Sequence, residues 1–176
     1  MIMEIFDLYD CARRPLGRTM VRGTPTPPGC YRLVVHVCIF NSSGEMLIQQ
    51  RQSFKDGWPG MWDITVGGSV ISGENTQAGA HRELLEELGL DVDFSKMAPA
   101  LTTTFTGGFD DVYILNMDLD PADLKLQYEE VQAARWATEA EVLDLIAQKQ
   151  FIPYSRPFMQ CLFFRRNHGG NFDTDK

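Results

Sequence analysis

The order of hydrophobic and polar residues along the chain predicts strands and helices in alternation. Residues 4–10, "EIFDLYD", alternate apolar and polar side chains, which is typical of a strand with one buried face. Residues 31–40, "YRLVVHVCIF", form a nearly continuous apolar run and predict a buried strand. A turn at "NSSG" joins this run to a strand over residues 45–52, so the two are expected to form a hairpin. The same signals predict further strands over residues 63–68, 100–108, 110–119 and 131–138.

Three segments have the spacing of apolar residues that is typical of helices. The first covers residues 76–88, with Gly89 placed where a left-handed C-terminal cap would lie. The second covers residues 139–148, with Thr138 as its N-cap. The third covers residues 157–167.

The remaining stretches are rich in glycine, proline or polar residues. Residues 18–30 and 55–62 are predicted to be surface loops. No internal repeat and no linker between two cores is recognisable, so residues 1–167 are expected to form one α/β domain of mixed strand order. Residues 168–176 are expected to be a flexible C-terminal tail.

Composition narrows the classes of partner. The chain has 176 residues, 16 lysines and arginines and 24 acidic residues, which gives a formal net charge of −8. This charge argues against binding to a nucleic-acid backbone or to an anionic membrane surface. It leaves room for a small phosphorylated ligand, because a cation and a few basic side chains can neutralise such a ligand locally.

Segments for export or membrane insertion are not expected. The N-terminus, "MIMEIFDLYD", is acidic where a secretory leader would be basic, and the longest apolar run is too short to span a bilayer. The four cysteines are widely spaced and show no C-x-x-C pairing, so free thiols in the cytoplasm are expected for Cys11, Cys30, Cys38 and Cys161.

The predicted helix over residues 76–88 carries several glutamates on one side. At 100° per residue, with Glu83 at zero, Glu86 lies at about 300° and Glu87 at about 40°. The leucines of the helix lie on the opposite side. This segregation alone is typical of any amphipathic surface helix and does not indicate a site.

The residues around this helix change that interpretation. The run "GSVISGENTQAGAHRELLEELGL", residues 68–90, fits the pattern G-x5-E-x7-R-E-U-x-E-E-x-G-U, in which U is aliphatic. A chance match to so many fixed positions is expected on the order of one time in 10⁶. The pattern is the Nudix box, complete at every position, and the chain therefore resembles the Nudix hydrolase family.

The resemblance implies a fold and a metal site. The implied fold is an α-β-α sandwich, with a loop–helix–loop that packs on a mixed sheet. The implied cofactor is Mg²⁺, with Mn²⁺ as an alternative, and the implied metal ligands are Glu83, Glu86, Glu87 and the carbonyl of Gly67. Adjacent carboxylates repel one another, and a divalent cation removes that penalty while it retains waters for phosphate oxygens.

The implied reaction is the hydrolysis of a diphosphate linkage in a small metabolite, such as a nucleoside diphosphate derivative. Glu83, Arg82 and Glu86 are the candidate catalytic residues, with Arg82 able to orient a carboxylate. For the general base, Glu83 is the first choice, and Asp111 and Glu130 are alternatives. Candidate substrate-binding residues outside the box are Arg51, Lys55, Asp111 and Glu130. A homodimer is one assembly seen among such proteins, but the residues define no interface.

A second resemblance concerns the segment before the box. "FKDGWPGMWDITVGG", residues 54–68, is similar to the corresponding segment of isopentenyl-diphosphate isomerases and of bacterial Nudix hydrolases related to them. The resemblance covers most of the chain, from about residue 4 to residue 164. Two enzyme classes, hydrolase and isomerase, therefore have to be compared.

The isomerase needs a cysteine and an acid on opposite sides of its substrate. In this alignment the cysteine position is Gly67, and the metal-binding histidine of the isomerase aligns with Arg32. Cys38 lies within an apolar strand and is expected in the core, whereas Asp111 keeps a carboxylate near the isomerase's acid position. The hydrolase is favoured over the isomerase, and a binding module that has lost turnover is a third alternative.

Overall fold

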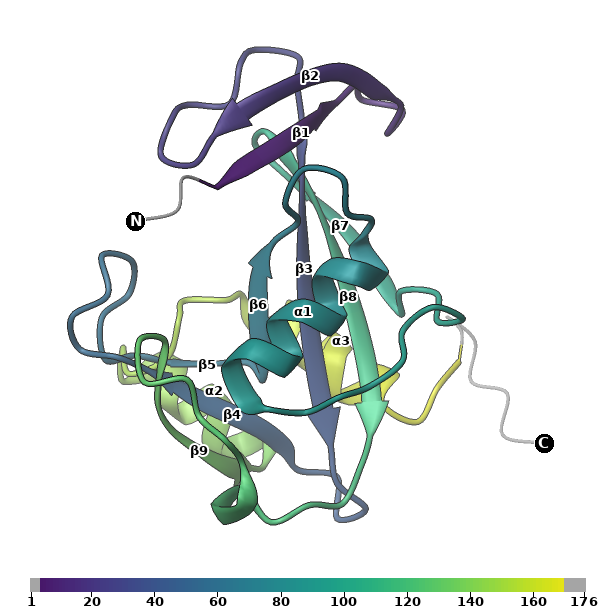
Figure 1. Cartoon of the computed structure of the whole chain (residues 1–176). Helices are drawn as coiled ribbons and strands as arrows, with labels where there is room; N and C mark the ends of the chain where they lie inside the picture. The colour runs from purple at the N-terminus through teal and green to yellow at the C-terminus, as the bar shows by residue number, and fades with distance from the viewer. Residues whose placement is uncertain (1–3, 170–176) are drawn as a thin grey trace.

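The computed structural model describes residues 4–169 and shows a seven-stranded mixed sheet between helices (Figure 1). The strands of this sheet are β3 (Arg32–Phe40), β4 (Met46–Arg51), β5 (Trp62–Asp63), β6 (Val66–Ser69), β7 (Leu101–Phe105), β8 (Gly108–Asn116) and β9 (Val131–Ala137). β3 is central: it pairs in parallel with β8 along its whole length, and antiparallel with β6 and β4. β7 pairs with β8, and β5 and β9 both pair with β4.

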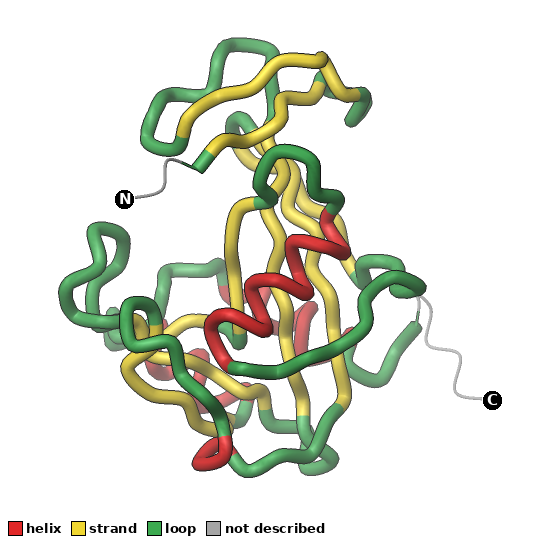
Figure 2. The backbone as a smooth tube through the Cα atoms, in the orientation of Figure 1, coloured by secondary structure: helices red, strands yellow, loops and turns green. Residues whose placement is uncertain are grey.

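Helices cover both faces of the sheet and bury a separate core on each. α1 (Thr76–Leu88) packs on one face, and α2 (Glu139–Ala147) and α3 (Arg156–Arg165) pack on the other (Figure 2). Alternate residues of β3 point to opposite faces, so that Val35 and Val37 join the α1 core while Cys38 and Phe40 join the other. The expected α-β-α sandwich with a mixed sheet is confirmed.

The helix of the box begins and ends as its sequence predicts. Asn75 is the N-cap, and its side chain accepts a hydrogen bond from the Ala78 amide at 2.8 Å. The C-cap is Gly89, whose φ of 71° is in the left-handed region that glycine adopts without strain. Thr138 caps α2 in a capping box with Glu141, so the prediction for that helix start is also confirmed.

The expectation of a loop over residues 18–30 is wrong for its first residues. β1 (Ile5–Tyr9) and β2 (Pro15–Val21) form a two-stranded antiparallel sheet that lies beyond the end of the main sheet (Figure 1). Of β2 only Met20 is buried, so the strand has no alternation of apolar and polar residues that could reveal it in the sequence.

The expected strand over residues 63–68 is divided into β5 and β6. Ile64 and Thr65 form a bend between them, and both are fully buried. The Thr65 hydroxyl accepts a hydrogen bond from the Ile39 amide at 2.9 Å and donates one to the Leu47 carbonyl. A side chain thus satisfies backbone groups where the pairing of the ladder is interrupted.

Three further expectations can be compared with the structure. All four cysteines are free, as predicted, and Cys38 is fully buried in the core. None of the helices in residues 4–169 is long and apolar enough to cross a membrane. The predicted tail, residues 168–176, lies outside the described residues from position 170 onward.

An ion pair fastens the β1–β2 hairpin to the main sheet. Arg13, in the turn between β1 and β2, donates two hydrogen bonds to the Asp111 carboxylate of β8, at 2.9 and 2.7 Å. The Asp111 side chain is only 3% exposed, and Thr102 donates a further hydrogen bond to it. Burial raises the pKa of Asp111, but the bonds from Arg13 and Thr102 outweigh burial and hold that pKa below its usual value.

We expect Arg13→Met to destabilise the fold by about 2–3 kcal/mol, because it leaves the buried Asp111 carboxylate without its charged partner. Urea unfolding measures this loss. Arg14→Met is the control, since Arg14 lies in the same turn, is exposed and, within residues 4–169, forms an ion pair with Asp10 alone. The double variant Arg13→Met/Asp111→Asn should recover part of the loss, and a loss equal to that of Arg14→Met would contradict this account of the ion pair.

Candidate active site

Gly67 and Gly68, two consecutive glycines of β6, allow the acidic side of α1 to lie close against this edge of the sheet. A Cβ atom on Gly68 would lie 2.1 Å from the Glu83 Cδ, so only glycine leaves space for that carboxylate. On the neighbouring position, a Cβ atom on Gly67 would lie 2.4 Å from the His36 Cδ2. Backbone without side chains is therefore what brings Glu83 and His36 against the same short strand.

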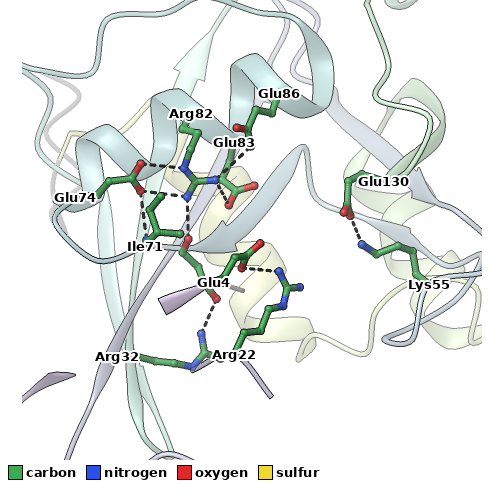
Figure 3. Close-up of polar contacts among 11 residues, drawn as sticks. Glu4, Arg22, Arg32, Lys55, Ile71, Glu74, Arg82, Glu83, Glu86 and Glu130 are labelled. Atoms are coloured by element: carbon green, nitrogen blue, oxygen red, sulfur yellow. Dashed lines mark hydrogen bonds and ion pairs between the residues drawn. The ribbon is translucent and has the colours of Figure 1, made fainter. Parts of the chain in front are cut away.

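Arg82 holds the carboxylates on its side of α1 in a fixed arrangement (Figure 3). Its guanidinium binds Glu74 with two hydrogen bonds, at 2.9 and 3.1 Å, and donates to Glu83 at 2.8 Å and Glu86 at 3.3 Å. It also donates to the Ser69 carbonyl at 3.0 Å, which ties the helix to β6. The expected contact of Arg82 with a carboxylate is present, and the carboxylate that accepts two hydrogen bonds is that of Glu74.

Glu83 and Glu87 are carboxylates in an environment that disfavours their charge. Burial raises the pKa of Glu83 to about 7, although Arg82 opposes the rise. Burial, and then the charge of Glu83, raises the pKa of Glu87 to about 8, although a hydrogen bond from Gln49 at 2.9 Å opposes it. Both groups would gain from a cation placed between them.

These carboxylates open into a cavity of about 380 Å³ that combines acidic and basic residues. Its acidic lining comes from Glu83, Glu87, Glu130 and Asp63, and its basic lining from Arg22, Arg32, Arg51 and Lys55. Of the residues predicted from the sequence, Gly67 also lines the cavity, whereas Arg82, Glu86 and Asp111 do not. The Glu86 side chain is 52% exposed on the outer side of α1.

The predicted substrate-binding residues Lys55 and Glu130 lie together. The Lys55 ammonium forms a short ion pair with the Glu130 carboxylate, and this pair joins the loop before β5 to the segment before β9 (Figure 3). Arg51 donates to the Gly57 carbonyl at 3.0 Å and lies 3.9 Å from the Asp63 carboxylate. Asp111, by contrast, is engaged by Arg13 outside the cavity.

A second polar group on the cavity wall is centred on His36, and its place there could not be predicted from the sequence. The His36 Nδ1 lies 2.8 and 2.9 Å from the two oxygens of Asp110, and its Nε2 lies 3.4 Å from the Tyr154 hydroxyl. Tyr154 in turn donates to Asp63 at 2.9 Å. Burial lowers the pKa of His36, but Asp110 outweighs burial and the pKa is raised overall. His36 is thus hydrogen-bonded within a strand of the core sheet, and its ring lies on the cavity wall.

The donor set suits a divalent cation that prefers oxygen ligands. Glu83, Glu87 and the Gly67 backbone border one cavity, and carboxylate and carbonyl oxygens are the ligands that Mg²⁺ accepts. Within residues 4–169, no three histidine, cysteine, aspartate or glutamate side chains are already gathered as a metal-binding group. Glu86 would have to turn away from Arg82 to complete the predicted set of three glutamates.

Comparison with known proteins identifies the family of the chain. The family model of the NUDIX domain matches residues 31–160. The chain therefore belongs to the Nudix family, and it is a hydrolase that acts on pyrophosphate bonds.

Individual relatives include both enzyme classes expected from the sequence. An uncharacterized Nudix hydrolase of Listeria monocytogenes is 43% identical over 165 residues, which cover 94% of this chain and 96% of the relative. An isopentenyl-diphosphate Delta-isomerase of Streptomyces coelicolor is 34% identical over 154 residues, which cover 84% of this chain and 77% of the relative. A crystal structure of a Deinococcus radiodurans protein shares the fold, with a TM-score of 0.74 and 24% identity over 90% of this chain and 99% of that one.

The raised pKa values of Glu83 and Glu87 predict how stability depends on pH. The unfolded carboxyls lose their protons near pH 4.5, whereas the folded ones retain them to about pH 7 and 8. The contribution of these two carboxyls to the free energy of unfolding is therefore fully present below pH 4.5, and it is lost as pH rises through 7 and 8. In EDTA, the melting temperature should therefore fall between pH 5.5 and 8.5, by roughly 2–4 °C for each kcal/mol of stability lost.

Mg²⁺ should reverse this trend, because it binds the deprotonated carboxylates, so its stabilising effect should increase with pH. Thermal melts at each pH, with EDTA or with MgCl₂, measure both effects. Glu87→Gln should flatten the slope in EDTA, whereas Asp144→Asn, an exposed site on α2, should not. A magnesium effect that is the same at all pH values would contradict the assignment.

Proposed function

We propose that the protein is a Mg²⁺-dependent Nudix hydrolase that cleaves a diphosphate linkage in a small metabolite, such as a nucleoside diphosphate derivative. The proposed metal ligands are Glu83, Glu86, Glu87 and the Gly67 carbonyl, and Mn²⁺ is an alternative ion. The observation that carries the proposal is a pair of carboxylates, the buried Glu87 and the 14% exposed Glu83, that line one cavity together with basic residues.

A bound Mg²⁺ would neutralise charge that develops on the phosphoryl oxygens when water attacks phosphorus. The protein's own residues have separate tasks. Arg51 and Lys55, which line the same cavity, bind phosphate oxygens, and Arg82 holds Glu83 in position. Fixed donors of this kind stabilise charge without reorganisation during the reaction.

Glu83 is the proposed general base, and Glu130 is the alternative. Both line the cavity, and the raised pKa of Glu83, about 7, is close to the range in which a carboxylate accepts a proton at neutral pH. Glu130 would first have to leave its ion pair with Lys55. The third candidate, Asp111, receives no support from the geometry, because Arg13 and Thr102 occupy its oxygens outside the cavity.

The isomerase alternative is favoured by the isomerases among the relatives but opposed by the residues beside β6. An isomerase needs a thiol at position 67. This chain has no cysteine there, and a side chain at that position would meet the His36 ring. The thiol of Cys38 is fully buried, and burial raises its pKa well above the usual value.

The proposed compartment is the cytoplasm, which the four free cysteines support because reducing compartments keep scattered thiols reduced. The homodimer remains a prediction.

We expect Glu87→Gln to lower Mg²⁺-dependent hydrolysis by at least about 100-fold while the fold is kept, because a neutral amide cannot compensate the cation's charge. Phosphate release from a panel of nucleoside diphosphate derivatives and prenyl diphosphates measures the effect. Asp144→Asn makes the same change of carboxylate to amide at an exposed position of α2 and should retain full activity. Near-normal turnover in Glu87→Gln would refute the metal assignment, and binding of the whole panel without cleavage would favour the binding module.

Incubation with isopentenyl diphosphate in D₂O separates hydrolase from isomerase. We expect no deuterium in the recovered prenyl diphosphates, because no thiol borders the cavity in residues 4–169. Nuclear magnetic resonance of the recovered compounds detects the exchange, and an authentic isomerase serves as the positive control. Clear incorporation at carbon would restore the isomerase interpretation.

A further inference from the structure

Arg32 differs from the other cations that line the cavity. Three of the four have a carboxylate within 4.0 Å: the pairs are Arg22–Glu4, Arg51–Asp63 and Lys55–Glu130. Arg32 has no such partner among residues 4–169. Figure 3 shows Arg22 and Arg32 on the hairpin side of the Arg82–Glu83 pair, and Lys55 and Glu130 well apart from them.

The Arg32 guanidinium is held in place by neutral groups only. It donates to the Ser69 hydroxyl at 2.8 Å, and it lies 5.7 Å from the Phe6 ring centre and 5.4 Å from that of Phe105. One of its five N–H donors is used within the described residues, and its nitrogens are not among the buried atoms that lack a partner. The free donors therefore face solvent in the cavity.

The charge of Arg32 is not compensated locally. Burial, and then repulsion from Arg22, lowers the pKa of Arg32 from its usual value. A half-buried, oriented and unpaired guanidinium beside the acidic helix gains from an anion that enters the cavity. The Arg22–Glu4 pair is largely exposed and weak, so Arg22 can turn to the same anion.

We propose that Arg32, assisted by Arg22, binds the free terminal phosphate of the substrate at the hairpin end of the cavity. This assignment rests on the proposed function and narrows its substrate class. A terminal phosphate has three unesterified oxygens and up to two charges, whereas a phosphate esterified on both sides has one charge. Two guanidinium groups match the former, because each can bind two phosphate oxygens at once.

The substrate class is therefore a nucleoside diphosphate with a free terminal phosphate, rather than a diphosphate that bears an organic group at each end. In its hydrolysis the water oxygen bonds to one phosphorus and the bridging P–O bond breaks. The products are the nucleoside monophosphate and inorganic phosphate, which together receive the atoms of the water.

Binding of methylenediphosphonate tests the subsite without turnover, because its P–C–P bridge cannot be hydrolysed. Calorimetry in MgCl₂ should show a loss of about 10–100-fold for Arg32→Met, as expected for charge-assisted hydrogen bonds. Arg32→Lys should recover part of it, and Arg22→Gln, at an exposed site, should lose less. The control is Arg18→Met, because Arg18 is exposed on β2 with no hydrogen bond or ion pair in the described residues. Unchanged affinity in folded Arg32→Met and Arg22→Gln would overturn the subsite.

Matched substrate pairs test the terminal phosphate: UDP with UDP-glucose, GDP with GDP-mannose, CDP with CDP-choline and ADP with ADP-ribose. The wild type should favour the free diphosphate of the best pair by at least about 10-fold in kcat/KM. Arg32→Met should remove that preference through KM, with kcat changed by less than about 3-fold. A wild type without the preference, or equal losses on both members of a pair, would overturn the assignment.

These outcomes remain distinct from a failure of the proposed function. If no compound is hydrolysed but Arg32→Met still weakens methylenediphosphonate binding, the hydrolase proposal fails and the anion subsite stands. If Arg32 had a purely structural role, Arg32→Met would instead lower the melting temperature, and its effect on kcat/KM would not differ between the members of a pair. Arg22→Gln would then show no effect.

Discussion

The burial of the Glu83 and Glu87 carboxylates is the constraint on which the rest of the site depends. Each loses solvation in the folded protein, and their proximity adds repulsion, so the helix that carries them is stable only with compensation. Arg82 supplies part of it, and because Arg82 also binds Glu74 and the Ser69 carbonyl, the same guanidinium fixes the helix against β6. Gly68 is required by the same constraint, since any side chain there would displace Glu83. Compensation remains incomplete without a cation, which is why the glutamates suit a metal better than a purely structural role.

The distribution of charge around the cavity matters more than the net charge of the protein. The chain carries −8 overall, yet four basic side chains from β3, β4 and the adjoining loops converge on a cavity of about 380 Å³. A diphosphate is attracted by these side chains and by the cation that the glutamates would hold, while the acidic surface repels nucleic acids. Because the positive charge is confined to this cavity, it attracts a small, doubly charged ligand but not a polyanion.

The sequence contains local signals for most of the fold, and the structure shows where such signals end. Asn75, Thr138 and Gly89 act through hydrogen bonds to neighbours in the chain, so both helix starts and the left-handed cap could be predicted. β2 could not, because its exposed residues carry no periodic pattern and only its pairing with β1 defines it. The box positions identified the acidic helix, but the sequence spacing placed Glu86 with Glu83 and Glu87, whereas Arg82 holds it outside the cavity. The convergence of Arg32 and His36 on that cavity depends on strand register and hairpin docking, which no local pattern encodes.

Positions 67 and 32 together explain how a fold shared with isomerases can favour hydrolysis. At position 67 the absence of a side chain admits the His36 ring, which Asp110 contacts at Nδ1 and Tyr154 at Nε2. At position 32 lies a guanidinium, which can neither coordinate a metal nor lose its charge at physiological pH. The Arg32 end of the cavity therefore carries a permanent positive charge on a side chain, and only the end at α1 suits a metal ion. In the proposed arrangement this asymmetry would orient an unsymmetrical diphosphate, because its more highly charged end is drawn to the pair of arginines while its bridging oxygen is left beside Glu83 and Glu87.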